Sequence, residues 1–305
     1  MKNIKIIREF SKEVKLVEDN DNKYIYKKII LPVTQEQEIL KKKFVDFLNA
    51  NNIKVARILE VFENENKELY EVQEFIKCDE ENSKTLQDIL KEIAKLHKVS
   101  AKWPDKIFNE KTYDSEDFCC GIQLTKILLG FEEKYYSYPL KNYEENKNLI
   151  PLEVREKVDQ IVNNFKIIYK YFVERNDIHS CICHNDLTTN NYLIKDNEVY
   201  FIDFDFAIHT SEYVDVIDVI LKRSLDFEAI INDYEGFKNN IADLLKSYNE
   251  VNDKLTLDSM LAMLVIKIVS YNIYINLNEV NLLKLLNGIN QIEQVTNIIK
   301  KDLKI

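Results

Sequence analysis

The chain has 305 residues and a formal net charge of −10, from 42 basic and 52 acidic side chains. This acidic balance excludes nucleic acid as the main partner, because a phosphate backbone needs a basic surface, but a nucleotide needs only a few local cations. No apolar run reaches transmembrane length, and residues 1–15 lack the apolar segment of a signal peptide, so we expect a soluble protein with no membrane partner. The five cysteines, which include the adjacent Cys119 and Cys120, do not follow the pattern of a disulfide framework and indicate the reducing cytoplasm.

Residues 1–77 predict a small antiparallel sheet with one helix. Two β-like runs, 13–19 and 22–30, are joined by a turn-forming Asn-Asp-Asn segment, and two more, 56–62 and 68–76, read as a second hairpin. Between the hairpins, residues 34–52 place Leu40, Phe44, Phe47 and Leu48 at helical spacing. The predicted order is strand, strand, helix, strand, strand, with a further strand in residues 3–7.

The rest of the chain is predicted to be mainly helical. Residues 86–100 are amphipathic, long helical stretches recur near 115–136 and 151–175, and helices resume from about 213 to the C-terminus. We expect a boundary near residues 77–83 that separates an N-terminal nucleotide-binding lobe, 1–77, from a helical lobe, 78–305. A cleft between two such lobes is a common place for a ligand.

The segment CHNDLTTNNYLIKDNEVYFIDFDFA, residues 183–207, interrupts the helices with two short strands. It contains the spacing H-x-D-x(4)-N, at His184, Asp186 and Asn191, followed by Asp203 at the end of an apolar strand. Phosphoryl transfer needs one carboxylate that faces the acceptor hydroxyl, and hard oxygen ligands that hold Mg²⁺ on the nucleotide phosphates. The pattern therefore predicts Asp186 as the catalytic, base-like residue and Asn191 with Asp203 as the magnesium ligands.

This segment resembles the catalytic segment of the aminoglycoside phosphotransferase and choline kinase group, and within that group it is most similar to the CotS-type spore coat proteins. The resemblance rests on the His-x-Asp-x(4)-Asn run, on IDFD at 202–205, on IAKLH at 93–97 and on VDVIDVILKR at 214–223. It implies an α+β, bilobal protein-kinase-like fold, with a small N-terminal antiparallel sheet plus one helix and a large, mainly helical C-terminal lobe.

The resemblance also implies the residues that bind the phosphates of ATP. Lys27 matches the strand lysine that reaches the phosphates, whereas alternation sends Lys28 to the other face of the strand. The helix partner of that lysine would be a glutamate. Glu36 lies one turn before Leu40, near the apolar face, and Glu38 points further away.

The other predicted nucleotide contacts lie in segments where this sequence differs in part from the pattern of the group. In the connection between the lobes, the backbone carbonyl of Glu74 and the amide of Ile76 would meet adenine. No glycine occurs between residues 1 and 120, so residues 8–13, with Ser11 as a donor, would cover the phosphates in place of a glycine-rich loop. Asn185 stands where members of the group usually carry glycine. Asp205 replaces the glycine of the protein-kinase triplet, a position where acidic residues are common in this small-molecule group, and would support the metal ligands.

His179, Cys181, Cys183 and His184 raise the alternative of a zinc site. Residues two apart on a strand are separated by about 6.6 Å. Ligands of one zinc ion lie much closer, since the Zn–S bond is about 2.3 Å. We therefore interpret the cysteines as small buried residues. For His184, the resemblance implies a structural role, since in the resembling fold this histidine forms a hydrogen bond that braces the catalytic loop.

Two polar residues of the predicted helices have competing interpretations. His97, at the end of an apolar helix, is interpreted as a core histidine with satisfied hydrogen bonds. Asp215 either anchors the catalytic loop or caps its own helix, and capping is the favoured interpretation.

Three functions are compatible with these residues. The first is an ATP- and Mg²⁺-dependent phosphotransferase that acts on a small hydroxyl-bearing acceptor, in a CotS-like protein made in the cytoplasm of the mother cell and deposited in the spore coat with other coat proteins. The second is a catalytically weak or inactive structural component of that coat, which the missing glycines favour. The third, a protein kinase, is disfavoured by the helical insert between residues 100 and 180.

The acceptor cannot be named from these patterns. Helices around 105–140 and from 213 onward would shape its pocket, and acidic residues there favour a cationic or polyhydroxy acceptor.

Overall fold

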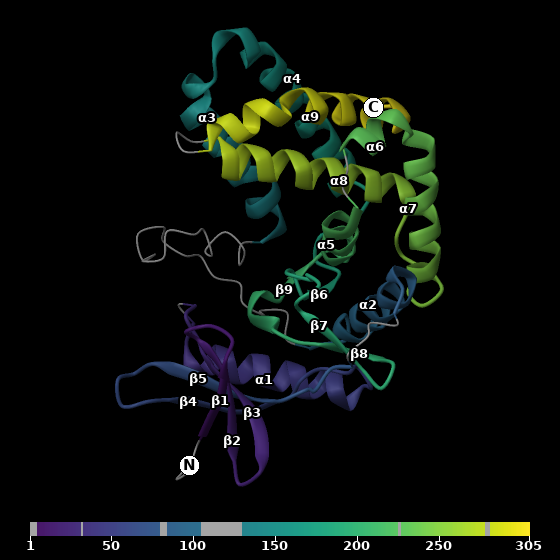
Figure 1. The fold of residues 1–305 in the computed structure, drawn as a ribbon. Helices are drawn as coiled ribbons and strands as arrows, with labels where there is room; N and C mark the ends of the chain where they lie inside the picture. The colour runs from purple at the N-terminus through teal and green to yellow at the C-terminus, as the bar shows by residue number, and fades with distance from the viewer. Residues whose placement is uncertain (1–4, 32, 80–83, 105–129, 225–226, 278–280) are drawn as a thin grey trace.

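The computed structural model of the chain describes residues 5–31, 33–79, 84–104, 130–224, 227–277 and 281–305. Its N-terminal part is a five-stranded antiparallel sheet with one helix against it (Figure 1). The strand order is β1-β2-β3-β5-β4. The elements are β1 (Lys5–Glu9), β2 (Val14–Asp19), β3 (Asn22–Lys28), α1 (Gln35–Ala50), β4 (Ile58–Glu63) and β5 (Leu69–Glu74).

Alternation along β3 decides which side chains reach the interior. Tyr26 and Lys28 are partly exposed, and Tyr26 packs against the aromatic rings of Phe62 and Tyr70. Lys27, between them, points the other way and is buried, as the alternation of a strand requires. Its Cα partner on β5 is Glu71, which is fully buried.

Helix α1 begins with a capping box, in which Thr34 and Gln37 satisfy each other's backbone amides. Its buried face has the i, i+3, i+4 spacing of an amphipathic helix. Two of the five residues on that face are charged, which breaks the rule for a helix that packs on a core. The buried residues are Glu38, Lys41, Phe44, Val45 and Leu48.

The C-terminal part is mainly helical, as predicted. Helix α8 is buried almost all round and packs against α4, α5, α7 and α9 at the centre of this part (Figure 1). The helices are α2 (Leu86–Ser100), α3 (Tyr138–Asn146), α4 (Leu152–Val173), α5 (Tyr213–Ser224), α6 (Phe227–Asn232), α7 (Tyr234–Asn249), α8 (Leu257–Tyr271) and α9 (Leu282–Asp302). Shorter turns are the π-helical η2 (Glu133–Ser137) and η5 (Asn272–Asn276) and the 3-10 turn η3 (Lys147–Leu149).

Four short strands lie between the sheet and the helices. β6 (Cys181–Cys183) pairs with β9 (Ile208–Thr210), and β7 (Tyr192–Lys195) pairs with β8 (Glu198–Phe201), all antiparallel. The 3-10 turn η4 (Phe204–Phe206) lies between β8 and β9. The predicted turn of the β7–β8 hairpin is confirmed, with Asp196 and Asn197 both at positive φ, the conformation that a tight two-residue turn requires.

Backbone hydrogen bonds attach this hairpin to the N-terminal part. The amide of Ala56 donates to the carbonyl of Phe201, and the amide of Phe201 donates to the carbonyl of Lys54. The residues that follow β8 are therefore held at a fixed position relative to the sheet. This matters because Asp203 and Asp205 lie only a few residues further on.

The architecture confirms the α+β prediction of a small antiparallel sheet with one helix followed by a mostly helical lobe. Of the helical stretch predicted near 115–136, the part before residue 130 lies outside the described residues, as do Cys119 and Cys120. No helix of the described chain has both the length and the apolar character needed to cross a membrane.

Phe44 joins the two parts of the core. It is fully buried, and its ring lies 5.4 Å from that of Trp103 and 6.0 Å from that of Phe204. Phe44→Ala should lower the free energy of unfolding by about 3–5 kcal/mol, through lost apolar burial and the cavity it leaves. Urea unfolding followed by the fluorescence of Trp103, the single tryptophan, measures this.

The matched control is Ile39→Ala, also on α1, where the side chain is 39% exposed. It should change the free energy of unfolding by about 0.5 kcal/mol or less. Equal effects of the two substitutions would contradict the assignment of Phe44 to the junction.

Candidate functional site

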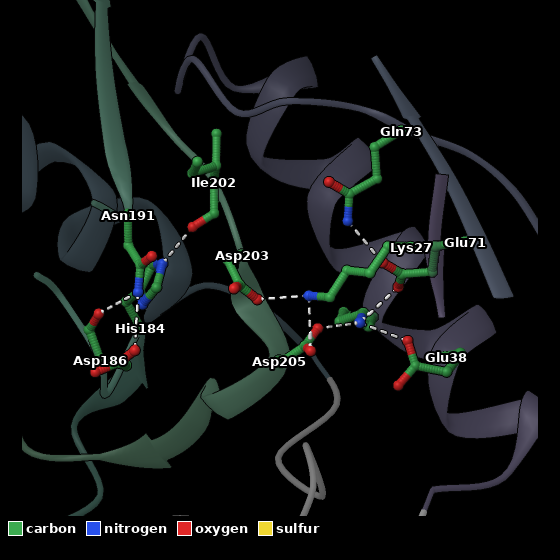
Figure 2. Close-up of polar contacts among 11 residues, drawn as sticks. Lys27, Glu38, Glu71, Gln73, His184, Asp186, Asn191, Ile202, Asp203 and Asp205 are labelled. Atoms are coloured by element: carbon green, nitrogen blue, oxygen red, sulfur yellow. Dashed lines mark hydrogen bonds and ion pairs between the residues drawn. The ribbon is translucent and has the colours of Figure 1, made fainter. Parts of the chain in front are cut away.

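The loop after β6 brings together two residues of the predicted catalytic set. The side-chain amide of Asn191 donates to the backbone carbonyl of Asp186 at 2.7 Å and to its carboxylate at 2.8 Å. Asn191 uses its amide nitrogen for these bonds, so its amide oxygen is the atom that could ligate a cation. The spacing of five residues therefore produces direct contact between the two side chains (Figure 2).

Asp203 forms an ion pair with Lys27, which lies 176 positions earlier in the chain. The ammonium of Lys27 lies 2.7 Å from one carboxylate oxygen of Asp203 and 2.7 Å from one of Asp205 (Figure 2). Asp203 has φ 64° and ψ 66°, a left-handed conformation that is uncommon for a residue other than glycine. Such backbone strain is often retained where it aims a functional side chain.

A second lysine, which sequence reasoning did not single out, completes an ion-pair network. Lys41 of α1 lies 2.8 Å from Asp205, 2.5 Å from Glu71 and 2.5 Å from Glu38. Its side chain is 2% exposed. The signal that could have found it is the helical spacing, since Glu38 and Lys41 share the face of Phe44.

The expected pairing of Glu36 with Lys27 is not what the structure contains. Glu36 is exposed in the first turn of α1, and the buried glutamate of that helix is Glu38, two residues further on and so on a different face. Glu38 contacts Lys41, while Lys27 contacts Asp203 and Asp205. The strand-to-helix pair is thus replaced by two lysines that share Asp205.

Burial and the neighbouring lysines have opposite effects on the pKa values of the carboxyl groups in this network. Burial raises the pKa of Asp205, but Lys27 and Lys41 outweigh it and hold the pKa well below its usual range. For Glu38 burial dominates and raises the pKa to about 8, although Lys41 opposes it. Burial thus favours the protonated form of Glu38. For Glu71 burial acts in the same direction, but Lys41 and the hydrogen bond with Glu38 outweigh it and lower the pKa.

The resulting charge balance favours a cation. The network holds the two lysines against the carboxylates of Asp203, Asp205 and Glu71, so its net charge is negative whether or not Glu38 carries a proton. Asp203 is the most open of these groups, with 40% of its side chain exposed. A divalent cation at Asp203 would therefore meet an excess of negative charge and a solvent-accessible oxygen ligand.

Asp215 holds the backbone of the catalytic loop, which corrects the interpretation of this residue as a helix cap. Its carboxylate accepts from the amides of His184 and Asn185, both at 2.7 Å, and faces Nε2 of His97 at 2.9 Å. The hydroxyl of Tyr248 lies 2.8 Å from the other ring nitrogen of His97. The interpretation of His97 as a satisfied core histidine is confirmed.

Asn185 and His184 belong to the catalytic loop itself and help to fix its conformation. Asn185 has φ 64°, the left-handed conformation that glycine adopts most readily, and asparagine is one of the few other residues that tolerate it. Nε2 of His184 lies 2.8 Å from the carbonyl of Ile202, next to Asp203, which confirms its interpretation as a brace.

The cysteines are closer together than strand spacing suggested. Their Sγ atoms are 3.6 Å apart, because the two side chains on one face of β6 converge, so the distance argument against a metal was wrong. Their third neighbour is His97, whose ligand atom lies within 4.8 Å of theirs, not His179 or His184. Both ring nitrogens of His97 are already bonded, and burial raises the pKa of the Cys183 thiol, so this cluster behaves as packed core.

The other nucleotide-binding candidates lie at the edge of the sheet. Glu74 ends β5, where its amide donates to the carbonyl of Arg57 and its carboxylate pairs with the Arg57 side chain. Ile76 follows in the connection and is buried. Ser11 lies between β1 and β2, where its hydroxyl accepts from the amides of Glu13 and Val14 and so closes the turn without a glycine.

Comparison with known proteins agrees with this geometry. The fold is that of the small-molecule kinase-like phosphotransferases. It is similar to an aminoglycoside phosphotransferase from Alicyclobacillus acidocaldarius, with a TM-score of 0.63 and 12% identity over 98% of this chain and 93% of that one. It is also similar to a microcompartment-associated aminopropanol kinase, with a TM-score of 0.62 and 13% identity over 99% and 92% of the two chains.

The family follows from the sequence match. The model of the ecdysteroid kinase-like family matches residues 18–241, and the chain belongs to this family. A probable bifunctional tRNA threonylcarbamoyladenosine biosynthesis protein from Methanobrevibacter smithii is 30% identical over 114 residues, which is 36% of this chain and 21% of that protein. The chain thus matches about a fifth of the length of this curated relative.

The loss of Lys41 should destabilise the protein strongly. Lys41→Met leaves Glu71 buried without its cation, and breaking a buried ion pair from one side typically costs about 3–5 kcal/mol. Lys42→Met is the control, because Lys42 is partly exposed and pairs with the exposed Asp46. Urea unfolding of both variants tests this, and equal stability of the two would show that the network is not held by Lys41.

The His97–Asp215 pair predicts a particular pH dependence. Burial would lower the pKa of His97, but its acidic neighbours, Asp215 among them, raise it to about 9. The folded state therefore binds the His97 proton more tightly than the unfolded state does. The contribution of this proton to the free energy of unfolding is complete below about pH 6.5 and is lost as the pH rises toward 9. The free energy of unfolding of the wild type should fall more steeply between pH 6.5 and 9 than that of His97→Gln. Parallel profiles from urea unfolding would contradict this.

Proposed function

We propose that the protein is an ATP- and Mg²⁺-dependent phosphotransferase that acts on a hydroxyl group of a small molecule. The observation that carries the proposal is the position of Lys27, whose ammonium bridges Asp203 and Asp205 beside the bonded pair Asp186 and Asn191. A cation for phosphates, oxygen ligands for a metal and a carboxylate for the acceptor are the groups that phosphoryl transfer needs.

Each group has a distinct role in this proposal. The carboxylate of Asp186, oriented by the amide of Asn191, faces the acceptor hydroxyl and accepts its proton. The amide oxygen of Asn191 and the carboxylate of Asp203 would hold Mg²⁺, and Lys27 would exchange its contact with Asp203 for the phosphates of ATP. When bound, Mg²⁺ neutralises charge on the transferring phosphoryl group.

The donor set fits magnesium rather than a softer metal. Both proposed ligands present oxygen, and Mg²⁺ prefers oxygen ligands and usually retains several waters. The negative net charge of the carboxylates around Lys27 and Lys41 supports the same assignment.

Nucleotide binding between the two parts of the chain belongs to the same proposal. We assign residues 1–77 to a nucleotide-binding lobe and 78–305 to a lobe with the catalytic loop and acceptor site, with the carbonyl of Glu74 and the amide of Ile76 at adenine. A solved GDP and kanamycin complex of an aminoglycoside phosphotransferase has the same fold, with a TM-score of 0.54 and 10% identity. That protein binds a nucleotide and a small acceptor, which supports this assignment by analogy of fold.

The second candidate is a kinase-like structural component of the spore coat with little or no turnover. Two observations favour it: no glycine occurs before residue 121, and Ser11 closes the β1–β2 turn with its own hydrogen bonds. The resemblance of residues 183–207 to CotS-type proteins supports a coat location, reached from the cytoplasm of the mother cell, for either candidate.

Two substitutions separate these candidates. Asp203→Ala should abolish the Mg²⁺-dependent part of nucleotide binding, measured by titration with a fluorescent ATP analogue. Asp186→Asn should retain that binding and lower acceptor-dependent ADP formation by about a hundredfold or more, the usual contribution of a general base.

The control is Asp243→Asn, at an exposed position on α7, which should bind nucleotide and turn over like the wild type. The phosphotransferase proposal fails if the wild-type protein shows no Mg²⁺-dependent nucleotide binding. Binding without ADP formation over a broad acceptor panel would favour the structural role.

A further inference from the structure

Gln73 is a polar residue on the same face of the five-stranded sheet as Lys27. It lies on β5, two residues after Glu71, and residues two apart on a strand share one face. Because Glu71 is the Cα partner of Lys27, Gln73 lies about 6.6 Å further along the face that Lys27 occupies. The Cα partners of Gln73 on the two neighbouring strands are Ile25 and Ile58, so it is a polar side chain between two apolar ones.

This position lies between the groups assigned to the two ends of the nucleotide. Lys27 is proposed to hold the phosphates, whereas the carbonyl of Glu74, the next residue after Gln73, and the amide of Ile76 are proposed to meet adenine. A nucleotide that extends from Lys27 to these backbone groups would pass beside the side chain of Gln73. That side chain is partly exposed, whereas Glu71 is fully buried, so Gln73 remains accessible to a ligand.

Glu71 fixes the orientation of the Gln73 side-chain amide. The amide nitrogen Nε2 donates to one carboxylate oxygen of Glu71 at 2.7 Å, and the other carboxylate oxygen lies 2.5 Å from the ammonium of Lys41. Although burial raises the pKa of Glu71, Lys41 and the hydrogen bond with Glu38 outweigh it and lower the pKa. An ionised carboxylate can only accept hydrogen bonds, so Gln73 must turn its nitrogen toward Glu71.

The carbonyl oxygen of the Gln73 amide is consequently left for another partner. Figure 2 shows this oxygen directed away from Glu71. Within the part of the chain that the structure describes, the oxygen has no hydrogen-bond partner. An acceptor of fixed direction is therefore available between Lys27 and the backbone groups assigned to adenine.

Adenine and guanine differ in the group that such an acceptor would meet. Adenine carries an amino group at C6, which donates hydrogen bonds, whereas guanine carries a carbonyl oxygen there, which only accepts them. Two oxygens that face each other leave both without a donor, and a polar group left unpaired in this way weakens binding by about tenfold to a hundredfold. A carbonyl oxygen held in one direction thus distinguishes the two bases.

We propose that Gln73 selects adenine over guanine, with its carbonyl oxygen accepting a hydrogen bond from the amino group of the base while Glu71 holds its nitrogen. This inference rests on the proposed function and deepens it, because it assigns the base preference of the same site. It also connects the base to the ion-pair network, since Glu71 contacts Lys41 and Lys41 contacts Asp205.

The test measures the affinity of the full chain for three nucleotides. ATP, GTP and ITP, each with Mg²⁺, compete with a fluorescent ATP analogue, and the displacement gives a dissociation constant for each. ITP carries the 6-oxygen of guanine without its 2-amino group, so it separates an effect at C6 from a steric effect at C2. The wild type should bind ATP at least about tenfold more tightly than GTP or ITP.

Two variants relate this preference to the pair of side chains. Gln73→Met removes the amide at similar length and should bring the affinities for ATP and ITP within about threefold of each other. Glu71→Gln should invert the preference, so that ITP binds more tightly than ATP. Lys41 then donates to the carbonyl oxygen of the substituted side chain, whose nitrogen faces Gln73 and turns the nitrogen of Gln73 toward the base.

The matched control is Gln160→Met, at an exposed position on α4, which should keep the wild-type ratio of the three affinities. Circular dichroism and urea unfolding of each variant establish that it is folded. Should Glu71→Gln fail to fold, because it alters the partner of a buried lysine, the ratio in Gln73→Met decides alone.

The outcomes that overturn this inference differ from those that overturn the proposed function. Wild-type affinity for ITP equal to or higher than that for ATP refutes selection by Gln73 while nucleotide binding stands. A parallel loss of affinity for all three nucleotides in Gln73→Met, with an unchanged ratio, also refutes it and leaves Gln73 only a structural part. Absence of Mg²⁺-dependent binding of every nucleotide to the wild type refutes the proposed function itself.

Discussion

Asp205 is the group on which the arrangement of the site depends. Its carboxylate contacts Lys27 of the sheet with one oxygen and Lys41 of α1 with the other, and its own backbone follows the β7–β8 hairpin. Three segments that are far apart in sequence are therefore joined at one carboxylate. Buried ion pairs of this kind add little net stability over an apolar core, but removing one partner is costly, so they fix geometry more than they stabilise the fold.

The site is also built without a glycine-rich loop, since no glycine occurs before residue 121. In this family member, Ser11 closes the β1–β2 turn and Asn185 adopts the positive φ that glycine would otherwise supply. These two positions thus form tight local structure without glycine, through side-chain hydrogen bonds at Ser11 and through the tolerance of asparagine for the left-handed region at Asn185. Lys27, held between two carboxylates, would need to exchange partners when phosphates bind.

Much of the fold could be predicted from local patterns, because alternation and helical spacing are properties of neighbouring residues. The strands around Lys27, the helix with Phe44 and the β7–β8 hairpin follow from such patterns. The spacing of Asp186 and Asn191 also anticipated their contact, since both lie in one short loop. The choice of Glu36 failed because distance along a helix does not reveal which face a sheet will cover.

The sequence by itself determined which residues could carry phosphoryl chemistry: a lysine on a strand, and a loop with carboxylates and an amide at a fixed spacing. Only the tertiary structure decided how their charges are shared. Lys41 and Asp215 acquire their roles from contacts between segments more than a hundred residues apart, and Glu71 acquires its role from the contact of strand β5 with helix α1. A buried charge is stable only beside its partner, and that partner is chosen by packing in three dimensions, which no local spacing records.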